Sequence, residues 1–435
     1  MASDREAVVG FAGMTHLGLV SASVCASKGF RTVCFDADAA LIRSLQAGHL
    51  HVEEPDLANL VKVNGARQIF AADPAALSAC DVVYISTDVP TDDKGRSDLA
   101  PVRALIDGIV PSLKAGATLV VLCQVPPGFT RNLRRPQPGP VYYQVETLIF
   151  GRAVERAAKP ERYIVGCDDP GRPLSPAFAE LLAAYGCPIL PMRYESAELA
   201  KISINFCLVA SIGVANTLAE LSEKVGADWA EIVPALKLDR RIGQWSYLAP
   251  GLGIAGGNLE RDLRTVLDLA AKHGTDSGIV EAWTANSQHR REWALERIKA
   301  SVLDKVDTPT VAVWGLAYKE NTHSIKNSPS LFTIERMPRA RVVVHDPVVP
   351  IDAVRHPHVK AASDPLAAVA GADALMILTP WPLYREVSIP DIVGAMRGKV
   401  VIDPFAVLDG KQIATAGVEY HTLGKSVSRP GRQGA

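Results

Sequence analysis

The sequence predicts an α/β protein in which two domains with doubly wound parallel sheets flank a central all-helical domain with a long helix. Short apolar runs alternate with amphipathic stretches in the N-terminal third, and the same alternation begins again near Pro309. This rhythm is typical of a parallel sheet covered on both faces. Between the two regions, residues 196–225 contain no proline, a single glycine and apolar residues on most helical faces. That segment predicts one long, mostly buried helix.

Composition limits the functions that the chain can have. Its 435 residues suffice for two or three domains. Lys and Arg number 46 against 47 Asp and Glu, so the net charge of -1 gives no electrostatic reason to bind nucleic acid or an acidic membrane. No stretch reaches about 18 uninterrupted apolar residues, and the first residues lack the layout of a signal peptide. We therefore predict a cytoplasmic protein without a transmembrane helix.

The seven cysteines carry a further prediction. None follows Cys207, and no two are spaced as Cys-x-x-Cys. An odd number without paired spacing fits a reducing compartment, in which the thiols are buried as small apolar side chains. The same pattern argues against a structural zinc site, and we expect no metal.

We place the domain boundaries at 1–195, 196–298 and 299–425, followed by a polar, basic tail at 426–435 that we expect to be disordered. The strands are expected where short apolar runs are rich in β-branched residues. In the first domain these runs are 7–12, 32–35, 82–85 and 118–122, and in the last they are 311–315, 342–346, 374–378 and 400–403.

A glycine-containing loop follows the first predicted strand. Residues 13–18 read GMTHLG, which matches GxGxxG with Thr15 in place of the middle glycine. Gly13 would make the tight turn and Gly18 would let the helix pack against the strand, so that the helix N-terminus faces a pyrophosphate. Asp36, 18 residues after Gly18, can bind ribose hydroxyls and favours NAD over NADP. The branched side chain of Thr15 leaves open a domain that no longer binds a dinucleotide well.

Longer motifs make the chain resemble the UDP-glucose/GDP-mannose dehydrogenase family over about residues 7–424. They include GHLHVEEPDLANLV, AELAKISINF, LKLDRRIG, WGLAYKENTHSIKNSPS and LMILTPWPLYRE. The resemblance implies an N-terminal NAD-binding Rossmann domain, a helical dimerisation domain and a C-terminal domain, also Rossmann-like, that holds the nucleotide of a nucleotide sugar. Family members oxidise a primary alcohol of a UDP- or GDP-sugar to a carboxylate in two hydride transfers to NAD. A cysteine holds the intermediate aldehyde as a thiohemiacetal and then as a thioester.

The resemblance also implies a set of catalytic residues. Lys201 and Asn205 match the family's active-site lysine and asparagine, and their spacing puts both on one face of a helix. Glu146, in QVETL, aligns with the glutamate of N-P-E-F-L, which activates water or relays protons. Asp262, in GGNLERD, matches the last residue of G-G-S-C-F-P-K-D. Without the resemblance, Lys201 and Glu146 would be interpreted as exposed surface residues and Asn205 as a capping or solvent-facing residue.

The same motif contains the main departure from the family. Counting back from Asp262, the position of the nucleophilic cysteine is Asn258, and no cysteine lies nearby in the sequence. A carboxamide has no thiolate with which to attack an aldehyde. One of the seven upstream cysteines could reach the site in three dimensions, although nothing in their spacing suggests it.

Other positions differ on the cofactor side and agree on the substrate side. Val89 stands in the family's G-T-P and Gln124 stands at the threonine of T-V-P-x-G-T, and the piece from 128 to 146 is short enough to have lost a helix. Lys326 and Asn327 replace the usual Arg-Glu pair. The substrate-binding residues that the resemblance implies are Arg241, Gly253, Gly256, Gly257 and Lys319, with Arg241 reaching the nucleotide sugar of the neighbouring subunit.

Three functions remain open from the sequence. The first is an NAD-dependent nucleotide-sugar dehydrogenase that lacks the thioester step. The second is a catalytically inactive homologue that binds a nucleotide sugar. The third is an oxidoreductase repurposed for a specialised sugar or nucleoside pathway. From the long helix and the resemblance we expect the protein to be a homodimer.

Overall fold

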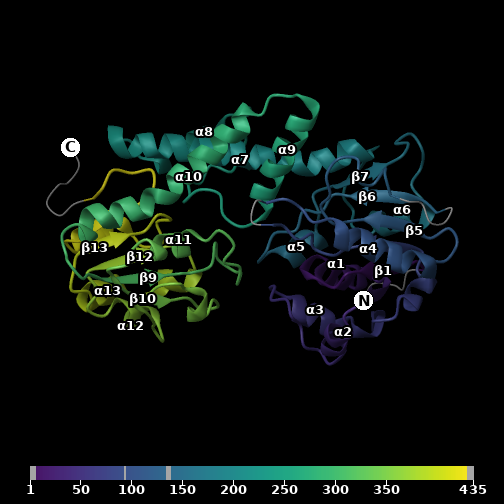
Figure 1. Ribbon diagram of the computed structural model, residues 1–435, viewed down its shortest axis with the longest axis horizontal. Helices are drawn as coiled ribbons and strands as arrows, with labels where there is room; N and C mark the ends of the chain where they lie inside the picture. Colours follow the sequence, from purple (N-terminus) through teal and green to yellow (C-terminus); the bar gives the residue numbers. More distant parts are fainter. Residues whose placement is uncertain (1–5, 93–94, 134–138, 429–435) are drawn as a thin grey trace. The chain divides into compact units, whose positions relative to one another are not determined.

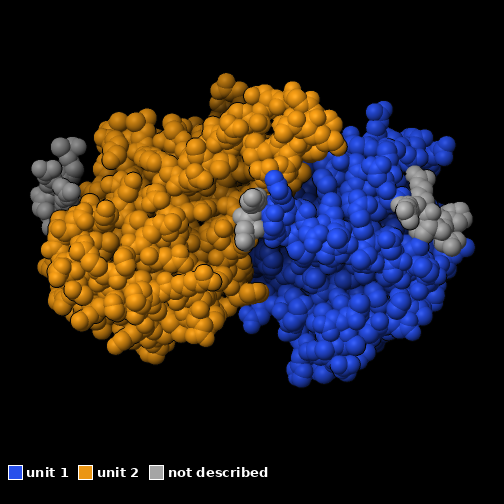
Figure 2. Space-filling model, viewed as in Figure 1, with its two compact units in different colours: residues 1–204 blue, residues 205–435 orange. Residues whose placement is uncertain are grey.

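The computed structural model describes residues 6–92, 95–133 and 139–428. The chain forms two compact units, Met1–Ile204 and Asn205–Ala435 (Figure 2). The boundary between them falls inside the long helix α7, Tyr194–Val225. The division into three domains by sequence is therefore still a prediction.

Unit 1 contains an eight-stranded sheet in the order β3-β2-β1-β4-β5-β6-β7-β8. Every neighbouring pair is parallel except β6 and β7. The first six strands have the order typical of dinucleotide-binding sheets, in which the ligand lies at the carboxyl ends where β1 meets β4. The strands are β1 Val8–Ala12, β2 Arg31–Phe35, β3 Gln68–Ala71, β4 Val82–Ile85, β5 Thr118–Val121, β6 Val141–Gln144, β7 Tyr163–Cys167 and β8 Ile189–Arg193.

The helices of unit 1 connect these strands and cover the sheet (Figure 1). The crossover from β5 to β6 has no helix among its described residues, 122–133 and 139–140. This agrees with the shortened piece in the sequence. The helices are α1 His16–Ser27, α2 Ala39–Gln46, α3 Leu57–Val63, α4 Ala100–Ile109, α5 Ala153–Ala158 and α6 Pro176–Ala183, with short turns η1 Gly65–Arg67, η2 Pro74–Ala79 and η3 Val110–Ser112.

Unit 2 contains a six-stranded, fully parallel sheet in the order β11-β10-β9-β12-β13-β14. Figure 1 shows α10 and α11 to one side of this sheet and α12 and α13 to the other. The predicted α/β class with two parallel sheets and a helical region is thus confirmed. The strands are β9 Thr310–Trp314, β10 Arg341–His345, β11 Val359–Ala361, β12 Ala374–Ile377, β13 Val400–Ile402 and β14 Glu419–His421.

The remaining helices of unit 2 follow the second half of α7. They are α8 Trp229–Leu238, α9 Asn258–His273, α10 Gly278–Ile298, α11 Pro329–Glu335, α12 Pro365–Val369, α13 Ile389–Ala395 and α14 Gly410–Thr415, with short turns η4 Lys299–Leu303, η5 Ile351–Ala353 and η6 Pro382–Glu386.

Helix α7 spans 32 residues, or about 48 Å at a rise of about 1.5 Å per residue. The prediction that it is mostly buried is wrong for the single chain, because Val214, Leu221 and Val225 are more than half exposed. Apolar periodicity shows that a face must be covered, not which neighbour covers it. By length and hydropathy α7 is also the one described helix that could cross a membrane, a test that the core helices of soluble proteins pass as well.

Two further expectations need correction. Cys207 is exposed and Cys187 is half-buried, so the thiols are not all buried. The tail is ordered at 426–428, where Ser428 and Tyr420 exchange backbone hydrogen bonds of 3.0 and 3.1 Å. Residues 429–435 lie outside the described part of the chain.

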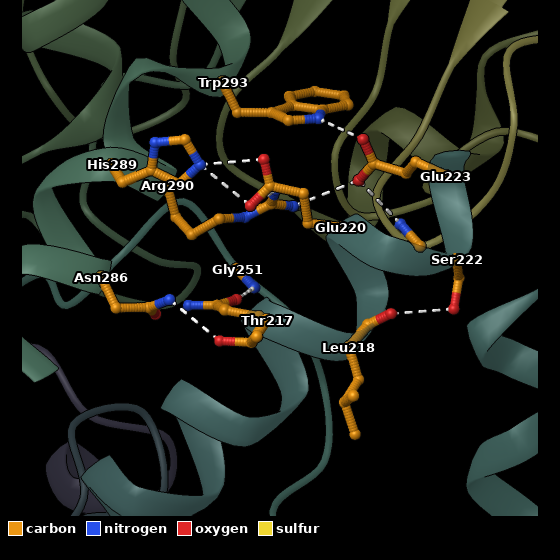
Figure 3. A network of polar contacts seen from close by, with 12 residues as sticks. Thr217, Leu218, Glu220, Ser222, Glu223, Gly251, Asn286, His289, Arg290 and Trp293 are labelled. Carbon is orange, nitrogen blue, oxygen red and sulfur yellow. Dashed lines mark hydrogen bonds and ion pairs between the residues drawn. The ribbon is translucent and has the colours of Figure 1, made fainter. Parts of the chain in front are cut away.

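A buried ion network fastens α10 to the end of α7 (Figure 3). The guanidinium of Arg290 has 1% side-chain exposure and lies 3.2 Å from both Glu220 and Glu223. Glu223 also accepts hydrogen bonds from Trp293 Nε1, at 2.9 Å, and from the backbone N–H of Gly424, at 3.2 Å. One carboxylate therefore connects two helices and the C-terminal segment.

We predict that Glu223→Ala destabilises unit 2 by about 3 kcal/mol, because removing one partner leaves a buried cation without full compensation. The free energy of unfolding in urea measures this. Glu296→Ala, at an exposed position in α10, is the control. A loss no larger than that of the control would contradict a stabilising role for the network.

Candidate active site

The nucleotide loop of unit 1 has the shape that its glycines predict. Gly13 has a φ of +97°, and a Cβ there would lie 2.7 Å from the Cβ of Thr87. At Gly18 a Cβ would lie 1.8 Å from the carbonyl oxygen of Gly13. Neither position tolerates a side chain, so the turn from β1 into α1 stays tight. The free N–H groups at the start of α1 are then available to an anion.

Thr15 and Asp36 are both tied into this loop. The hydroxyl of Thr15 accepts a hydrogen bond of 3.0 Å from the backbone N–H of Asp88. The carboxylate of Asp36 accepts bonds from the N–H groups of Met14, at 2.8 Å, and Asp38, at 2.9 Å. A carboxylate has about four acceptor positions, so Asp36 can still bind a ribose. These residues fit a dinucleotide, with Thr15 as the remaining steric obstacle.

Val89 and Gln124 lie on the same edge of the sheet as the loop. Val89 follows β4 and is buried, whereas Gln124 follows β5 and is half-buried. The carboxyl ends of parallel strands share one edge, so their position agrees with a place beside a cofactor.

A buried carboxylate beside the loop was not singled out from the sequence. The side chain of Glu54 is fully buried and accepts a bond of 2.8 Å from Nε2 of His16, the first residue of α1. Glu54 also accepts bonds from the N–H groups of Gly151 and Ala153, at the start of α5. The signal was present in VEEPDL, where an acidic pair precedes proline.

Glu198 is a second such residue. It lies on α7, is fully buried, and accepts a bond of 2.8 Å from the N–H of Thr130 and another from the N–H of Gly128. Burial raises the pKa of its carboxyl. Glu198 thereby fastens the loop after β5 to the helix that carries Lys201.

The structure brings Lys201 and Glu146 together in unit 1. The Nζ of Lys201 lies 3.5 Å from Oε2 of Glu146, and the two side chains have exposures of 11% and 18%. Glu146 follows β6, and its other oxygen accepts a bond from the backbone N–H of Leu148. A largely buried ammonium and carboxylate can offer a charge of either sign to a bound ligand.

Asn205 and Asp262 form a second pair, in unit 2. Asn205 Nδ2 donates to Asp262 Oδ2, and both side chains are buried. Asn258 is the first residue of α9, one helical turn before Asp262, and is exposed. Cys207 is the one cysteine in residues 205–435. Cys207 lies two positions after Asn205 on α7. Its side chain therefore points about 200° around the helix axis from that of Asn205.

The loop at 251–257 is held closely. Gly253 and Gly256 have φ angles of +78° and +79°, and a Cβ at Gly253 would lie 2.4 Å from the carbonyl oxygen of Ser287. The backbone N–H of Ile254 donates to Ser287 Oγ at 2.7 Å, and that of Gly251 donates to Asn216 Oδ1 at 2.8 Å. Gly257 has an ordinary φ and precedes α9. The loop therefore presents backbone in a fixed shape.

Two cations of the predicted substrate site have different surroundings. The side chain of Arg241 is 90% exposed, and its guanidinium is paired in two places with Asp239, at 3.0 and 2.6 Å. The Nζ of Lys319 lies 5.8 Å from the centroid of the Tyr318 ring, in the loop after β9. Arg241 thus does not join the other predicted site residues within this chain.

The loop after β9 repeats the geometry of the nucleotide loop. Gly315 has a φ of +92° and is crowded by Thr379, as Gly13 is crowded by Thr87. Asp346 accepts bonds from the N–H groups of Leu316, at 2.6 Å, and Ala317, at 3.2 Å, as Asp36 does in unit 1. This second loop was not predicted, although WGLAY and VHDP mark its two parts in the sequence.

Three sequence models of one family match successive parts of the chain. They are the NAD binding domain of the UDP-glucose/GDP-mannose dehydrogenase family at 7–179, its central domain at 195–288 and its UDP binding domain at 312–410. The chain belongs to this family. It is thus an NAD-dependent oxidoreductase of the nucleotide-sugar dehydrogenase family that acts on CH–OH groups.

Individual relatives align with this chain over nearly its whole length and nearly their own. The UDP-glucose 6-dehydrogenase TuaD of Bacillus subtilis is 29% identical over 96% of this chain and 93% of its own length. The UDP-glucose 6-dehydrogenase of Pseudomonas aeruginosa is 29% identical over 95% and 96%. A UDP-glucose dehydrogenase structure from Pyrobaculum islandicum has a TM-score of 0.82 at 28% identity, covering 94% of this chain and 96% of that one.

We predict that Thr15→Gly strengthens NAD binding by about threefold to tenfold, because it removes branched bulk from the path of the pyrophosphate. Isothermal titration with NAD measures the dissociation constant. Thr15→Ser, which keeps the hydroxyl, is the matched control. Weaker binding by the glycine variant alone would show instead that the Thr15 side chain supports the cofactor site.

Proposed function

We propose that this dehydrogenase oxidises its nucleotide sugar by hydride transfer without a cysteine thioester. The observation that carries the proposal is Asn258, which stands at the start of α9 where the family motif has its nucleophile. The other residues of the family's chemistry are present and paired, as Lys201 with Glu146 and Asn205 with Asp262. Loss of the thiol alone removes the covalent step and leaves the first oxidation possible.

The first oxidation needs a base for the hydroxyl proton and polar groups for the developing charge on oxygen. NAD, when bound, supplies the hydride acceptor. The carboxylate of Glu146 can take up the proton, and the ammonium of Lys201, 3.5 Å away, can stabilise the developing charge on oxygen. Asn205 uses one N–H on Asp262, which leaves its amide oxygen and second N–H for a ligand.

The balance of this step fixes the product. The alcohol gives one proton to the protein and one hydride to NAD, so the product has two hydrogens fewer and is an aldehyde or a ketone. A covalent hold on the aldehyde would need a nucleophile, and a carboxamide is not one. We therefore propose one NADH for each sugar. A second oxidation would have to proceed through a hydrated aldehyde, with Glu146 as the base.

We predict that a panel of UDP-, GDP- and dTDP-sugars with NAD yields NADH from at least one member, and that mass spectrometry finds a product lighter by two hydrogens. An acid formed with two NADH would contradict the single oxidation. Stabilisation of the protein by a nucleotide sugar, without formation of NADH, would favour the inactive binding homologue. The departures from the family motifs at Thr15 and Asn258 also support that alternative.

For the same substrate we predict that Lys201→Ala lowers kcat by about 100-fold to 10,000-fold while the fold is retained, because the positive charge that stabilises the developing charge on oxygen is lost. Lys224→Ala, near the other end of α7, is the matched control. A variant with an unchanged rate and an intact circular dichroism spectrum would remove Lys201 from the mechanism.

We also propose that the protein is a homodimer that buries the exposed apolar side of α7. Contiguous exposed apolar surface of this kind marks an interface. A membrane is a poorer occupant, because α7 also carries Glu220 and Glu223, which form the ion network. The exposed guanidinium of Arg241 is then available to the second subunit. The exposed apolar residues of unit 2 that share this side of α7 are Val214, Leu218, Leu221 and Val225.

Accordingly, Leu218→Glu combined with Leu221→Glu is expected to convert the dimer to a monomer, because two charges would have to be buried without partners. Light scattering after size exclusion gives the mass. Val63→Glu, at a 70% exposed position on α3, should leave the dimer intact. A double variant that remains dimeric would place the interface elsewhere.

A further inference from the structure

A polar clamp made by Glu260, Arg291 and Asn327 holds the glycine loop at 251–257. The guanidinium of Arg291 donates to the carbonyl oxygen of Ile254 at 2.7 Å, and Asn327 Nδ2 donates to that of Gly256 at 3.0 Å. The N–H of Gly256 donates to the carbonyl oxygen of Lys326, also at 3.0 Å. Both polar groups of Gly256 are therefore bound by the segment at 326–327.

Glu260 connects the two side chains of the clamp. Its carboxylate accepts a bond from Asn327 Nδ2 and lies 3.4 Å from the guanidinium of Arg291. Glu260 is in the first turn of α9, where a negative charge is favoured by the helix dipole. Burial raises the pKa of its carboxyl, and the charges of Arg291 and Lys326 act in the opposite direction. The loop, the start of α9 and α10 are thus linked through one carboxylate.

Asn327 adopts a backbone conformation that fits this role. Its φ is +54°, in the left-handed region that asparagine tolerates better than most residues. On the far side of the loop, a Cβ at Gly256 would lie 3.1 Å from the ring of Tyr318. Gly256 is consequently held between an amide on one side and an aromatic ring on the other.

Both ends of the clamp stand where the sequence departs from the family motifs. Glu260 occupies the proline position of G-G-S-C-F-P-K-D, and Asn327 occupies the glutamate position of the usual Arg-Glu pair. The contact between them makes the two changes compatible in this chain. A glutamate at 327 would face the carboxylate of Glu260 and the carbonyl oxygen of Gly256, all of which accept hydrogen bonds and none of which donates. An amide at 327 satisfies both.

We propose that Glu260 and Asn327 are a coupled pair of positioning residues that sets the shape of the glycine loop for the sugar part of the substrate. The inference rests on the proposed function for its ligand, a nucleoside-diphosphate sugar. It implies that Asn258 belongs to a site that keeps a function through a new pair of contacts, and not to a site that has lost its function. The loop then governs affinity for the sugar more than affinity for the nucleotide.

The first test needs no ligand. In Asn327→Asp a single amide nitrogen becomes an oxygen, so the donor to Gly256 and Glu260 is lost. We expect hydrogen–deuterium exchange of residues 251–257 to be about tenfold faster in this variant. Adding Glu260→Gln removes the repulsion between the two carboxylates. Exchange in the double variant should therefore be about threefold slower than in Asn327→Asp alone. Glu260→Gln alone keeps an acceptor and should change exchange by less than about twofold. Glu335→Gln, exposed on α11, is the control.

The second test measures the dissociation constants of UDP-glucose and UDP for the same variants in the full-length protein. We expect Asn327→Asp to weaken UDP-glucose by about tenfold and UDP by less than about threefold, with partial recovery in the double variant. A purely structural role would lower the melting temperature and weaken both ligands equally.

The outcomes separate the inference from the proposed function. Unchanged exchange at 251–257 in Asn327→Asp would overturn the clamp, whatever binds. Faster exchange with equal loss for UDP-glucose and UDP would overturn the assignment to the sugar. If the wild-type protein bound neither UDP-glucose nor any other nucleotide sugar of the panel, the proposed function and the assignment to the sugar would both fail. The exchange experiment alone would then decide whether the pair is coupled.

Discussion

In each unit the candidate site residues depend on one polar side chain of α7, Lys201 in unit 1 and Asn205 in unit 2. One helical turn carries an ammonium and an amide on the same face. Each side chain then meets a carboxylate from a different segment, Glu146 after β6 and Asp262 in α9. Within each unit the carboxylate holds the side chain of α7 in its rotamer. Both polar pairs are largely buried, so breaking either would leave an uncompensated group.

A second constraint is the close approach of backbone to backbone at three glycine loops. Gly13, Gly253 and Gly315 all have positive φ and leave no space for a Cβ. In the two loops that follow β1 and β9, an aspartate at the end of the neighbouring strand binds the loop N–H groups, as Asp36 and Asp346 show. The same local solution therefore serves the NAD binding domain and the UDP binding domain. The loop at 251–257 uses side chains of α10 and the segment at 326–327 instead.

Much of this could be predicted because the signals are local. Apolar runs, glycine spacing and the absence of proline from 196–225 depend on neighbours in the sequence, and they identified the sheets, the nucleotide loop and α7. The contacts of Glu54, Glu198 and Glu260 could not be predicted, since each carboxylate binds groups between about 30 and 100 residues away in the chain. Burial of α7 was overestimated for the same reason.

By itself, the sequence determined the α/β class, the long helix and the position of Thr15 in the nucleotide loop, and it predicts Asn258 at the place of the family's nucleophile. These properties follow from residue type and spacing. Only the tertiary structure decided that Lys201 pairs with Glu146, that Arg241 lies exposed beside Asp239, and that Glu260 meets Asn327. Such pairings depend on how distant segments pack, and a hydrogen bond between them has no period in the chain from which it could be read.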